Sequence, residues 1–527
     1  MVQGFRQIVG WTALSRVLGM VRDMGFAYFL GAGGLMDAWA IAFKVPNLAR
    51  RLFGEGAAAS SLIPVYSEEL HRDPRRATEL ALSVVTAVFV LLAAVTLLGE
   101  AVLWLYYRFG ATYEGTRLKL ALSGVMLPYM VLVCVVAILG GILNAHRHFA
   151  APAAAPAVLN AFIIAALCLG GWLIQMPRQT HVFLVAVAVL LAGLAQLAIQ
   201  VPPLARQGIP LRPAWEMRSE PFRRVLWLMG PMVLGLTATQ ISTLINDFTA
   251  LWLSGSAEKG ESFILFGHAV RYPLWEGAVS HLFYAQRLYQ LPLGVFGTSL
   301  ATAIFPEMSV DAARKDYEAL RRTISHGARC TIFVAVPATV GLLLVSRPVV
   351  AAIFERGEFL SADTAKTAAA LSFYVLGLTG YFAQQVLTRA YYSLQESGVP
   401  ARTAVLAVGI GLVLNLVLVW PLGSGGLAAA TAISAYVQVA MLAATLRRRL
   451  GPGVLAGIGR AVRDTAIATM FMTAAVWGVQ TLFGRSSGVL GLLAAVSAGA
   501  AVYVMAARLL HIEMLSLLVR TGSKREQ

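Results

Sequence analysis

The stretch that decides the fold is residues 15–64, which read SRVLGMVRDMGFAYFLGAGGLMDAWAIAFKVPNLARRLFGEGAAASSLIP. It is apolar enough to lie in a membrane, yet it carries ionisable side chains at Arg16, Arg22, Asp23, Asp37, Lys44, Arg50, Arg51 and Glu55. On insertion scales, one arginine at the centre of a membrane helix costs about 2.5–3.5 kcal/mol. The arginines must therefore face a polar, water-filled interior, and a cavity lined with arginine predicts an anionic ligand.

The composition of the whole chain agrees with a membrane protein. Of its 527 residues, 58% are hydrophobic and 13% are charged, and the mean hydropathy is +0.72. A soluble domain carries about 25% charged residues, so charge is strongly depleted here. The apolar runs are long and lack the strict alternation of a transmembrane barrel, and lipid admits only helices and closed barrels. We therefore expect an all-α polytopic membrane protein.

The formal net charge of +16 does not by itself indicate nucleic-acid binding. The basic residues lie mostly in short loops between apolar runs, and loops on one side hold about twice as many as those on the other, as the positive-inside rule predicts. We therefore expect both termini in the cytoplasm and no nucleic-acid partner. The three cysteines, Cys134, Cys168 and Cys330, stand singly within apolar runs and predict neither a disulfide nor a metal site.

The apolar runs predict about 14 transmembrane helices. Residues 1–205 are expected to form a first lobe of six spans, and residues 225–446 a second lobe of six. Polar connectors at 206–224 and 447–464 are expected on the cytoplasmic side. Residues 465–527 supply the last two spans and a C-terminal tail.

Two segments outside these spans have a distinct composition. The loop at 254–279 is longer and more aromatic than its neighbours, and we interpret it as holding a short interfacial helix with Tyr272 and Trp275 at headgroup level. The segment 311–322 reads DAARKDYEALRR and predicts a short charged surface helix.

A faint internal repeat relates the second and eighth spans. Each contains a basic residue, a proline, a Phe-Gly pair, small residues and a second proline before a charged loop. The shared positions are Pro46, Phe53-Gly54 and Pro64 in the second span, and Arg287, Pro292, Phe296-Gly297 and Pro306 in the eighth. Because six spans separate the two, this order fits a parallel duplication of six-helix lobes.

Two interpretations of the first arginines remain open. Arg16 and Arg22 are six residues apart, about 9 Å along a helix. In one interpretation, Asp23 and Asp37 form internal salt bridges with them and hold the first two helices together. In the other, the arginines bind an anion. We favour the second because basic residues outnumber acids here and because guanidinium groups bind phosphate through paired hydrogen bonds.

The segment from Pro46 to Glu55 predicts a broken helix, which in transporters exposes backbone groups to a cavity. Arg50 and Arg51 are adjacent, so they cannot both face one cavity along a regular helix. We expect one of them to contact a headgroup or a neighbouring helix, with Glu55 as a local partner.

Other polar residues give weaker predictions. Asn246 and Asp247 in the seventh span and Asn415 in the eleventh are candidate cation-binding or hydrogen-bonding positions. The sequence contains no phosphate-binding loop, nucleophile elbow or zinc-binding helix motif. It therefore predicts neither an enzyme nor a resident metal or cofactor.

Four motifs resemble one family. They are SRVLGMVRD, GAGGLMDAWAIAFKVPNLARRLFGEG, YAQRLYQLPLGVFGTSLATAIFP and IFERGEF at 353–359, and they resemble the MurJ family of bacterial lipid II flippases. The resemblance implies two six-helix lobes around a central cavity, with the last two helices forming a groove for a lipid tail. It implies alternating access that carries a pyrophosphate-linked headgroup to the outer leaflet of the inner membrane, without covalent catalysis.

The same resemblance implies particular site residues. The substrate-binding positions fall on Arg16, Arg22, Arg50, Arg287 and the acidic partner Asp37. Supporting positions within the motifs fall on Ser15, Asp23, Pro46, Asn47, Arg51, Glu55, Gln286 and Gln290. The implied partners are lipid II or a similar polyprenyl-pyrophosphate-linked substrate, membrane lipids and other cell-wall synthesis proteins. No cofactor is implied beyond dependence on membrane potential or a cation gradient.

The chain departs from the family pattern at two places. Gln286 and Gln290 stand where similar members carry acids, which makes the expected cavity more positive. The acids of a sodium site reported for some members fall on Asn246 and Asn415, with Asp247 one residue off, which argues against sodium coupling. Two other functions stay open, namely export of another polyprenyl-pyrophosphate-linked glycan and a non-transporting membrane scaffold.

Overall fold

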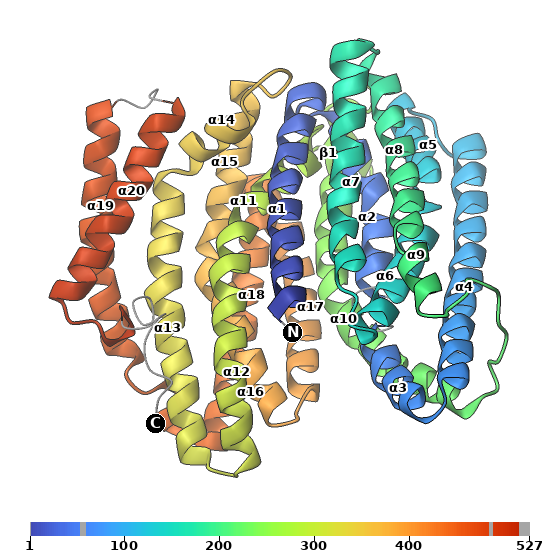
Figure 1. Ribbon diagram of the computed structural model, residues 1–527. Coiled ribbons are helices and arrows are strands. Elements are labelled where there is room, and N and C mark those ends of the chain that lie inside the picture. The colour runs from blue at the N-terminus through green and yellow to red at the C-terminus, as the bar shows by residue number, and fades with distance from the viewer. Residues whose placement is uncertain (1, 53–58, 484–487, 516–527) are drawn as a thin grey trace. The chain divides into compact units, whose positions relative to one another are not determined.

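The computed structural model describes residues 2–52, 59–483 and 488–515, which are helical apart from turns and two small sheets (Figure 1). The expected all-α fold class is confirmed. The first ten α-helices are α1 (Val2–Leu30), α2 (Gly34–Ala49), α3 (Ala59–Arg72), α4 (Pro74–Phe109), α5 (Glu114–Met126), α6 (Tyr129–Ala145), α7 (Ala150–Cys168), α8 (Arg178–Ala198), α9 (Val201–Arg206) and α10 (Glu220–Trp252). The others are α11 (Ala278–Pro292), α12 (Thr298–Ala313), α13 (Tyr317–Leu344), α14 (Ser346–Phe354), α15 (Ser361–Leu376), α16 (Leu378–Ser393), α17 (Gly398–Leu422), α18 (Ser424–Leu450), α19 (Ile458–Phe483) and α20 (Gly488–Leu509).

The chain divides into two compact units. Unit 1 comprises Met1–Asp247, Ser254–Ser280 and Arg356–Phe359, and unit 2 comprises Phe248–Leu253, His281–Glu355 and Leu360–Gln527. Unit 1 thus continues past the connector at 206–224, where we placed the end of the first lobe. The physical reason is that α10 is bonded to the end of α2, through an ion pair of Lys44 with Asp247 and a hydrogen bond from Arg51 to Gln240.

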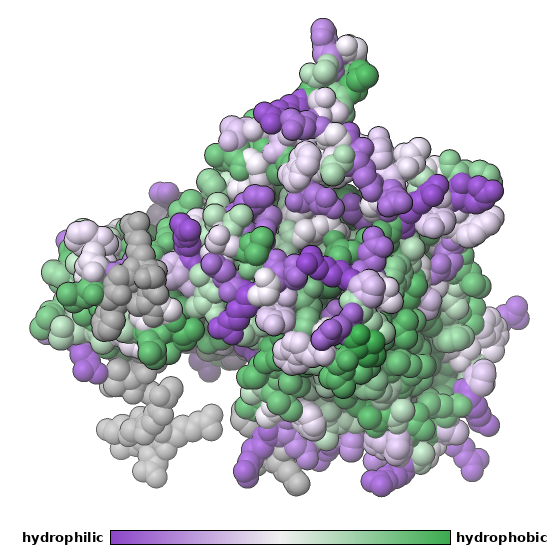
Figure 2. All heavy atoms as spheres, turned by 90° about the horizontal axis from the view of Figure 1, so that it is seen from above, coloured by the Kyte–Doolittle hydropathy of each residue, from purple (hydrophilic) through white to green (hydrophobic). Residues whose placement is uncertain are grey.

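Ten helical stretches among the described residues are long and apolar enough to cross a membrane, the first at Pro74–Phe109 and the last at Gly488–Leu509. The expected number of 14 is not confirmed. The charges of α1 and the short lengths of α2, α15 and α16, each of 16 residues, keep these helices out of the ten. Figure 2 shows hydrophilic side chains gathered over the upper and middle part of the view and a broad area of hydrophobic side chains below them.

The second and eighth spans are both interrupted after a proline. In the second, α2 contains Pro46 and passes at Arg50–Leu52 into a wider, π-type turn. In the eighth, α11 ends at Pro292 and the π-helical segment η3 (Leu293–Gly297) precedes α12. Proline removes one backbone hydrogen bond and crowds the preceding turn, and π-type turns often follow such breaks. The Phe53-Gly54 part of the repeat lies outside the described residues.

The loop at 254–279 is a pair of small sheets, so the expected interfacial helix is wrong. Strands β1 (Ser254–Gly255) and β4 (Leu274–Trp275) pair in parallel at its base, and β2 (Ser262–Leu265) and β3 (His268–Arg271) form an antiparallel hairpin. The hairpin turn is Phe266-Gly267, and both residues have positive φ, 49° and 82°. The run Ser-Phe-Ile-Leu favours a strand over a helix because aromatic and β-branched side chains pack well on a pleated surface.

Residues 311–322 do not form a separate surface helix, which corrects a second expectation. α12 continues to Ala313, Lys315 adopts a left-handed conformation with φ of 57°, and α13 begins at Tyr317. The side chain of Asp316 accepts a hydrogen bond from the amide of Ala319 at 2.9 Å and so caps α13. The charged segment is therefore the turn between two long helices.

The last two long helices pack on α13 within unit 2. Phe333 on α13, Ala468 and Met472 on α19, and Ala495 and Tyr503 on α20 belong to one buried cluster. The hydroxyl of Tyr503 donates to the backbone oxygen of Phe333 at 2.6 Å. Figure 1 shows α19 and α20 side by side.

Candidate functional site

Arg22 in unit 1 is held by three side-chain hydrogen bonds. It lies on α1 and is 9% exposed. Its Nε and Nη2 donate to Oδ1 of Asp23 at 3.0 and 2.7 Å. Its Nη1 donates to Oδ1 of Asn160 on α7 at 2.9 Å, and Nδ2 of Asn160 donates to the backbone oxygen of Ser15 at 3.0 Å. The guanidinium is therefore compensated by a carboxylate and fixed in orientation by an amide.

Asn160, which contacts Arg22, was not among the residues predicted from the sequence. It is buried in the apolar run PAVLNAFIIAALC of α7, where one amide among hydrophobic residues was the only available signal. A buried amide needs hydrogen-bond partners, and Asn160 satisfies both ends of its side chain with α1. It thus ties α7 to the helix that carries the arginines.

Arg16 differs from Arg22 in its surroundings. It is exposed, and within the part of the chain that the structure describes its side chain makes no hydrogen bond or ion pair. It lies six residues before Arg22 on the same helix, about 9 Å along the axis. Arg16 is therefore a cation whose hydrogen-bonding groups stay available to a ligand.

The two arginines at the end of α2 point to different partners. Arg50 donates from Nε and Nη2 to Oδ1 of Asn47 at 3.2 and 3.0 Å, whereas Arg51 donates from Nη1 to Oε1 of Gln240 on α10 at 3.1 Å. One of the pair thus contacts a neighbouring helix and the other a residue of its own helix. Glu55, expected as a local partner, lies outside the described residues.

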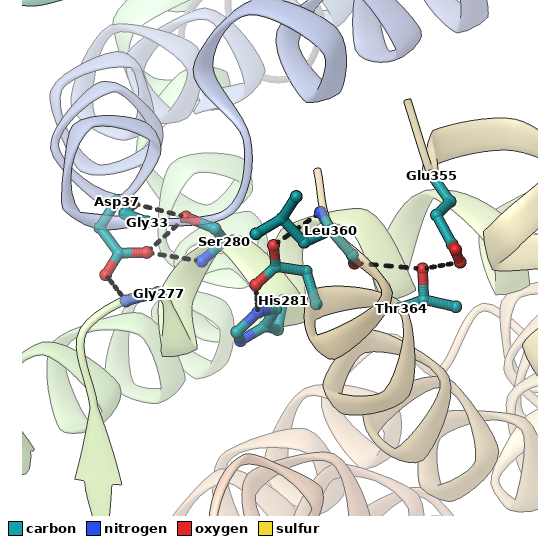
Figure 3. A network of polar contacts seen from close by, with 9 residues as sticks. Gly33, Asp37, Gly277, Ser280, His281, Glu355, Leu360 and Thr364 are labelled. Atoms are coloured by element: carbon teal, nitrogen blue, oxygen red, sulfur yellow. Dashed lines mark hydrogen bonds and ion pairs between the residues drawn. The ribbon is translucent and has the colours of Figure 1, made fainter. Parts of the chain in front are cut away.

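Asp37 binds the start of α11 (Figure 3). Its Oδ1 accepts hydrogen bonds from the amide and the hydroxyl of Ser280 at 2.7 and 2.5 Å, and its Oδ2 accepts one from the amide of Gly277 at 2.7 Å. Among the described residues it forms no ion pair with an arginine, which departs from its expected role as their acidic partner. A carboxylate at a helix N-terminus is favourable because it meets free amide groups and the positive end of the helix dipole.

A second polar cluster in unit 2 joins α11 to the start of α15 (Figure 3). His281 Nε2 lies 3.1 Å from Oδ1 of Asp363, and Oδ2 of Asp363 accepts from the amide of Leu360 at 3.0 Å. The hydroxyl of Thr364 donates to Oε2 of Glu355 at 2.6 Å. Burial acts to raise the pKa of Asp363, but the hydrogen bonds from His281 and Leu360 outweigh it and hold that pKa below its usual value.

The motif IFERGEF closes against the end of α1 within unit 1. The amide of Glu358 donates to the backbone oxygen of Tyr28 at 2.9 Å, and the Glu358 carboxylate pairs with Arg178 at 2.5 Å. Gly357 has a φ of 61°, and a Cβ added there would lie 2.3 Å from the oxygen of Tyr28. Glycine is required here because both the conformation and the close backbone approach exclude a side chain.

The candidate cation positions lie in two units. In unit 1, Asp247 forms an ion pair with Lys44, and Asn246 beside it is buried. In unit 2, Asn415 is buried on α17. Among the described residues no group of three or more His, Cys, Asp or Glu side chains is arranged to hold a metal ion. The ammonium of Lys44 supplies the positive charge next to Asp247.

Arg287 lies on α11 in unit 2. Its guanidinium carbon is 4.6 Å from the centre of the Phe283 ring, a cation–π arrangement. Gln286 donates from Nε2 to the hydroxyl of Tyr374 at 3.0 Å, and Gln290 is exposed. The two glutamines therefore supply neutral amides on either side of this arginine.

Comparison with known proteins decides the family. The model of the family described as "Lipid II flippase MurJ" matches residues 26–498. The chain belongs to the MurJ family. A "Probable lipid II flippase MurJ" of Vibrio cholerae is 30% identical over 97% of this chain and 96% of its own length. A "Lipid II flippase MurJ" of Burkholderia cenocepacia is also 30% identical, over 84% of this chain and 83% of its own.

Solved structures agree on the fold. "Lipid II flippase MurJ, inward closed conformation" has a TM-score of 0.76 and 23% identity over 97% of this chain and 99% of that one. An inward-facing transporter of the multidrug resistance MATE family has a TM-score of 0.63 and 15% identity, over 83% of this chain and 95% of that one. As a MurJ family member with ten candidate spans, the chain is a transporter rather than an enzyme, and a multi-pass protein of the bacterial inner membrane.

Proposed function

We propose that this chain moves lipid II from the cytoplasmic to the outer leaflet by alternating access, with both termini in the cytoplasm. Membership of the MurJ family supports the substrate class. The observation that carries the mechanism is the state of Arg22, a buried guanidinium on a helix among membrane spans with three of its five N–H groups bonded. Two N–H groups stay available for an oxygen of the substrate.

We propose that the pyrophosphate is held by Arg16, Arg22, Arg50 and Arg287. Arg16 is exposed and makes the first contact, while Arg22 is pre-oriented by Asn160 and loses little conformational entropy on binding. Asp23 keeps Arg22 neutralised while the site is empty, so the substrate competes with one carboxylate for it. This balance suits a transporter, because a substrate that binds too tightly is not released.

The contact of Asp37 with Gly277 and Ser280 supports a role at the extracytoplasmic end. It holds the start of α11 against α2 through three short hydrogen bonds. We propose that these bonds are made while the cytoplasmic side is open and are broken when the substrate is released outward. Membrane potential is a sufficient driving force in principle, at about 2.3 kcal/mol per charge per 100 mV.

The test is flipping of lipid II by the purified chain in proteoliposomes. Arg22→Ala, Arg16→Ala and Arg287→Ala are each expected to abolish flipping, while Arg22→Lys is expected to restore it poorly because an ammonium lacks the paired N–H groups. The control is Arg322→Ala, whose side chain is 73% exposed at the start of α13. Full flipping by the arginine-to-alanine variants would overturn the proposal.

The same assay separates the other functions. A polyprenyl-pyrophosphate carrying a different glycan, offered in place of lipid II, tests the exporter of another glycan. A scaffold would leave both substrates unmoved and would not restore growth of cells that lack their own flippase. The driving force is identified by measuring the rate of flipping with a membrane potential, a proton gradient or a sodium gradient, each imposed alone.

A further inference from the structure

The hairpin between α10 and α11 carries an apolar tip. Its turn is Phe266-Gly267, and the register pairs Leu265 with His268 and Ile264 with Ala269. Phe266 is 93% exposed and Ile264 is 80% exposed, and Leu265 beside them is also exposed. Ile264 and Phe266 thus project from the loop with little packing on the chain, and Leu265 between them is about half exposed.

Phe266 has a backbone conformation that is unfavourable for its residue type, with a φ of 49°. Residues at positive φ in a two-residue hairpin turn are usually Asn, Asp or Gly, and a bulky aromatic residue is disfavoured there. The Phe266 ring does not offset this by packing on the hairpin, because it is almost fully exposed. The side chain therefore serves a contact outside the protein, since the fold of the hairpin alone favours another residue.

Polarity is graded along the loop. Residues 262–267, which read SFILFG, carry no charge, whereas Glu258, Lys259, Glu261 and Arg271 all lie nearer the base. Several contacts hold the base together: β1 pairs with β4, the amide of Tyr272 donates to the oxygen of Glu261 at 2.8 Å, and the Phe263 and Tyr272 rings are 4.9 Å apart. The imidazole of the exposed His268, which pairs with Leu265 across the turn, is the one ionisable group of the hairpin between residues 262 and 270. A strongly charged macromolecule therefore finds few partners at this tip, whereas lipid does not require a charge.

We propose that Ile264, Leu265 and Phe266 insert into the lipid interface of the membrane leaflet at this end of the molecule. The hairpin follows α10, which ends at Trp252, and precedes the candidate span Ala278–Ala313, so its base is tied to the membrane surface. Trp275, exposed on β4 at the base, is an aromatic residue of the kind found at headgroup level. This step rests on the proposed orientation with both termini cytoplasmic, which makes this the outer leaflet. The tip then anchors the loop that leads into Gly277, whose amide donates to Asp37 on α2.

The experiment measures membrane depth with a nitroxide label in proteoliposomes of purified protein. Cys134, Cys168 and Cys330 are replaced by alanine, and a single cysteine is placed by Phe266→Cys or, as the aqueous control, by Glu261→Cys. At position 266 we expect collisions with oxygen to exceed those with a water-soluble nickel complex, and at position 261 the reverse. Equal access of the nickel complex to both labels would overturn the proposal and leave a protein partner as the occupant of the tip.

A second pair of labelled proteins keeps the hairpin intact while the aromatic ring is removed. The label is placed at the exposed Ala269, and Phe266 is either kept or changed to asparagine. Asn-Gly is a preferred pair for this turn, so Phe266→Asn is expected to fold at least as well. We expect nickel access at position 269 to rise in the asparagine variant. No change would also count against insertion.

Discussion

Asp37 and Ser280 lie 243 residues apart, and the carboxylate of the first accepts both the amide and the hydroxyl of the second. Asp37 thereby caps α11, the helix that carries Arg287. The capping bonds link an acid of the opening stretch to the start of α11, without any arginine between them. We therefore propose that Asp37 acts through the position of this helix.

Loss of this cap is expected to loosen the start of α11. Asp37→Ala removes the acceptor of two backbone amides and should cost about 1 kcal/mol, as other capping substitutions do. Asp37→Asn keeps one acceptor oxygen and should have an intermediate effect. Hydrogen exchange of peptides covering residues 274–284 measures this, with faster exchange expected in the order wild type, Asp37→Asn, Asp37→Ala. Unchanged exchange would show that the cap is not maintained in solution.

Asn160 is expected to matter for transport through Arg22. Asn160→Ala removes an acceptor from a charged donor, an interaction worth about 1.5–3 kcal/mol, so flipping at low substrate should fall roughly tenfold or more. Asn160→Asp keeps the acceptor and adds a negative charge that competes with an anionic substrate, so it should also reduce flipping. Thr403, a buried hydroxyl on α17, supplies the control through Thr403→Ala. Normal flipping by both Asn160 variants would refute this role.

The ion pair of Lys44 and Asp247 is expected to stabilise unit 1 mainly by compensating two charges. Lys44→Met leaves Asp247 without its cation, and removing one partner of a buried pair typically costs about 3–5 kcal/mol. The double variant Lys44→Met, Asp247→Leu should recover most of this loss. Thermal unfolding in detergent is the measurement. A single variant as stable as the double variant would mean that the pair contributes little.

The pair of His281 and Asp363 predicts a pH dependence of stability. The pKa of Asp363 is below its ordinary value of 3.8. The ionised carboxylate therefore stabilises the folded protein above pH 3.8, and this stabilisation is lost as the pH falls through the lowered pKa. Asp363→Asn should therefore lower the unfolding temperature at pH 7 but approach the wild type below about pH 4. A difference between the two proteins that stays constant across this range would contradict the assignment.

Gly357 is expected to be intolerant of any side chain. Gly357→Ala forces alanine into positive φ, at about 1–2 kcal/mol, and also places its Cβ against the Tyr28 oxygen. Gly260 offers a matched control, because its φ is 81° and an added Cβ would meet nothing within 4 Å. The unfolding temperature should fall more for Gly357→Ala than for Gly260→Ala. Equal losses would assign the whole effect to backbone conformation.

Local sequence patterns correctly predicted those features of the fold that depend on residues close together in the chain. The helical class and the interruption of the helix that contains Pro46 follow from composition and spacing. Pro292 was recognised only as part of the internal repeat, and the structure adds the interruption after it. The hairpin at 262–271 was missed because aromatic residues near a membrane also suit an interfacial helix, and only the pairing of two strands distinguishes them. Asn160 was missed because a single amide gives no periodic signal.

By itself, the sequence determined that this chain is a helical membrane protein with more basic than acidic side chains in its first spans, because the cost of arginine in lipid leaves few other arrangements. Only the tertiary structure decided which charges are already compensated. Arg22 is bonded to Asp23 and Asn160, Lys44 to Asp247, and Asp37 to the start of α11, whereas Arg16 is exposed. The physical reason is that hydrogen bonds and ion pairs act over about 3 Å between helices distant in sequence, and spacing along one helix does not encode them.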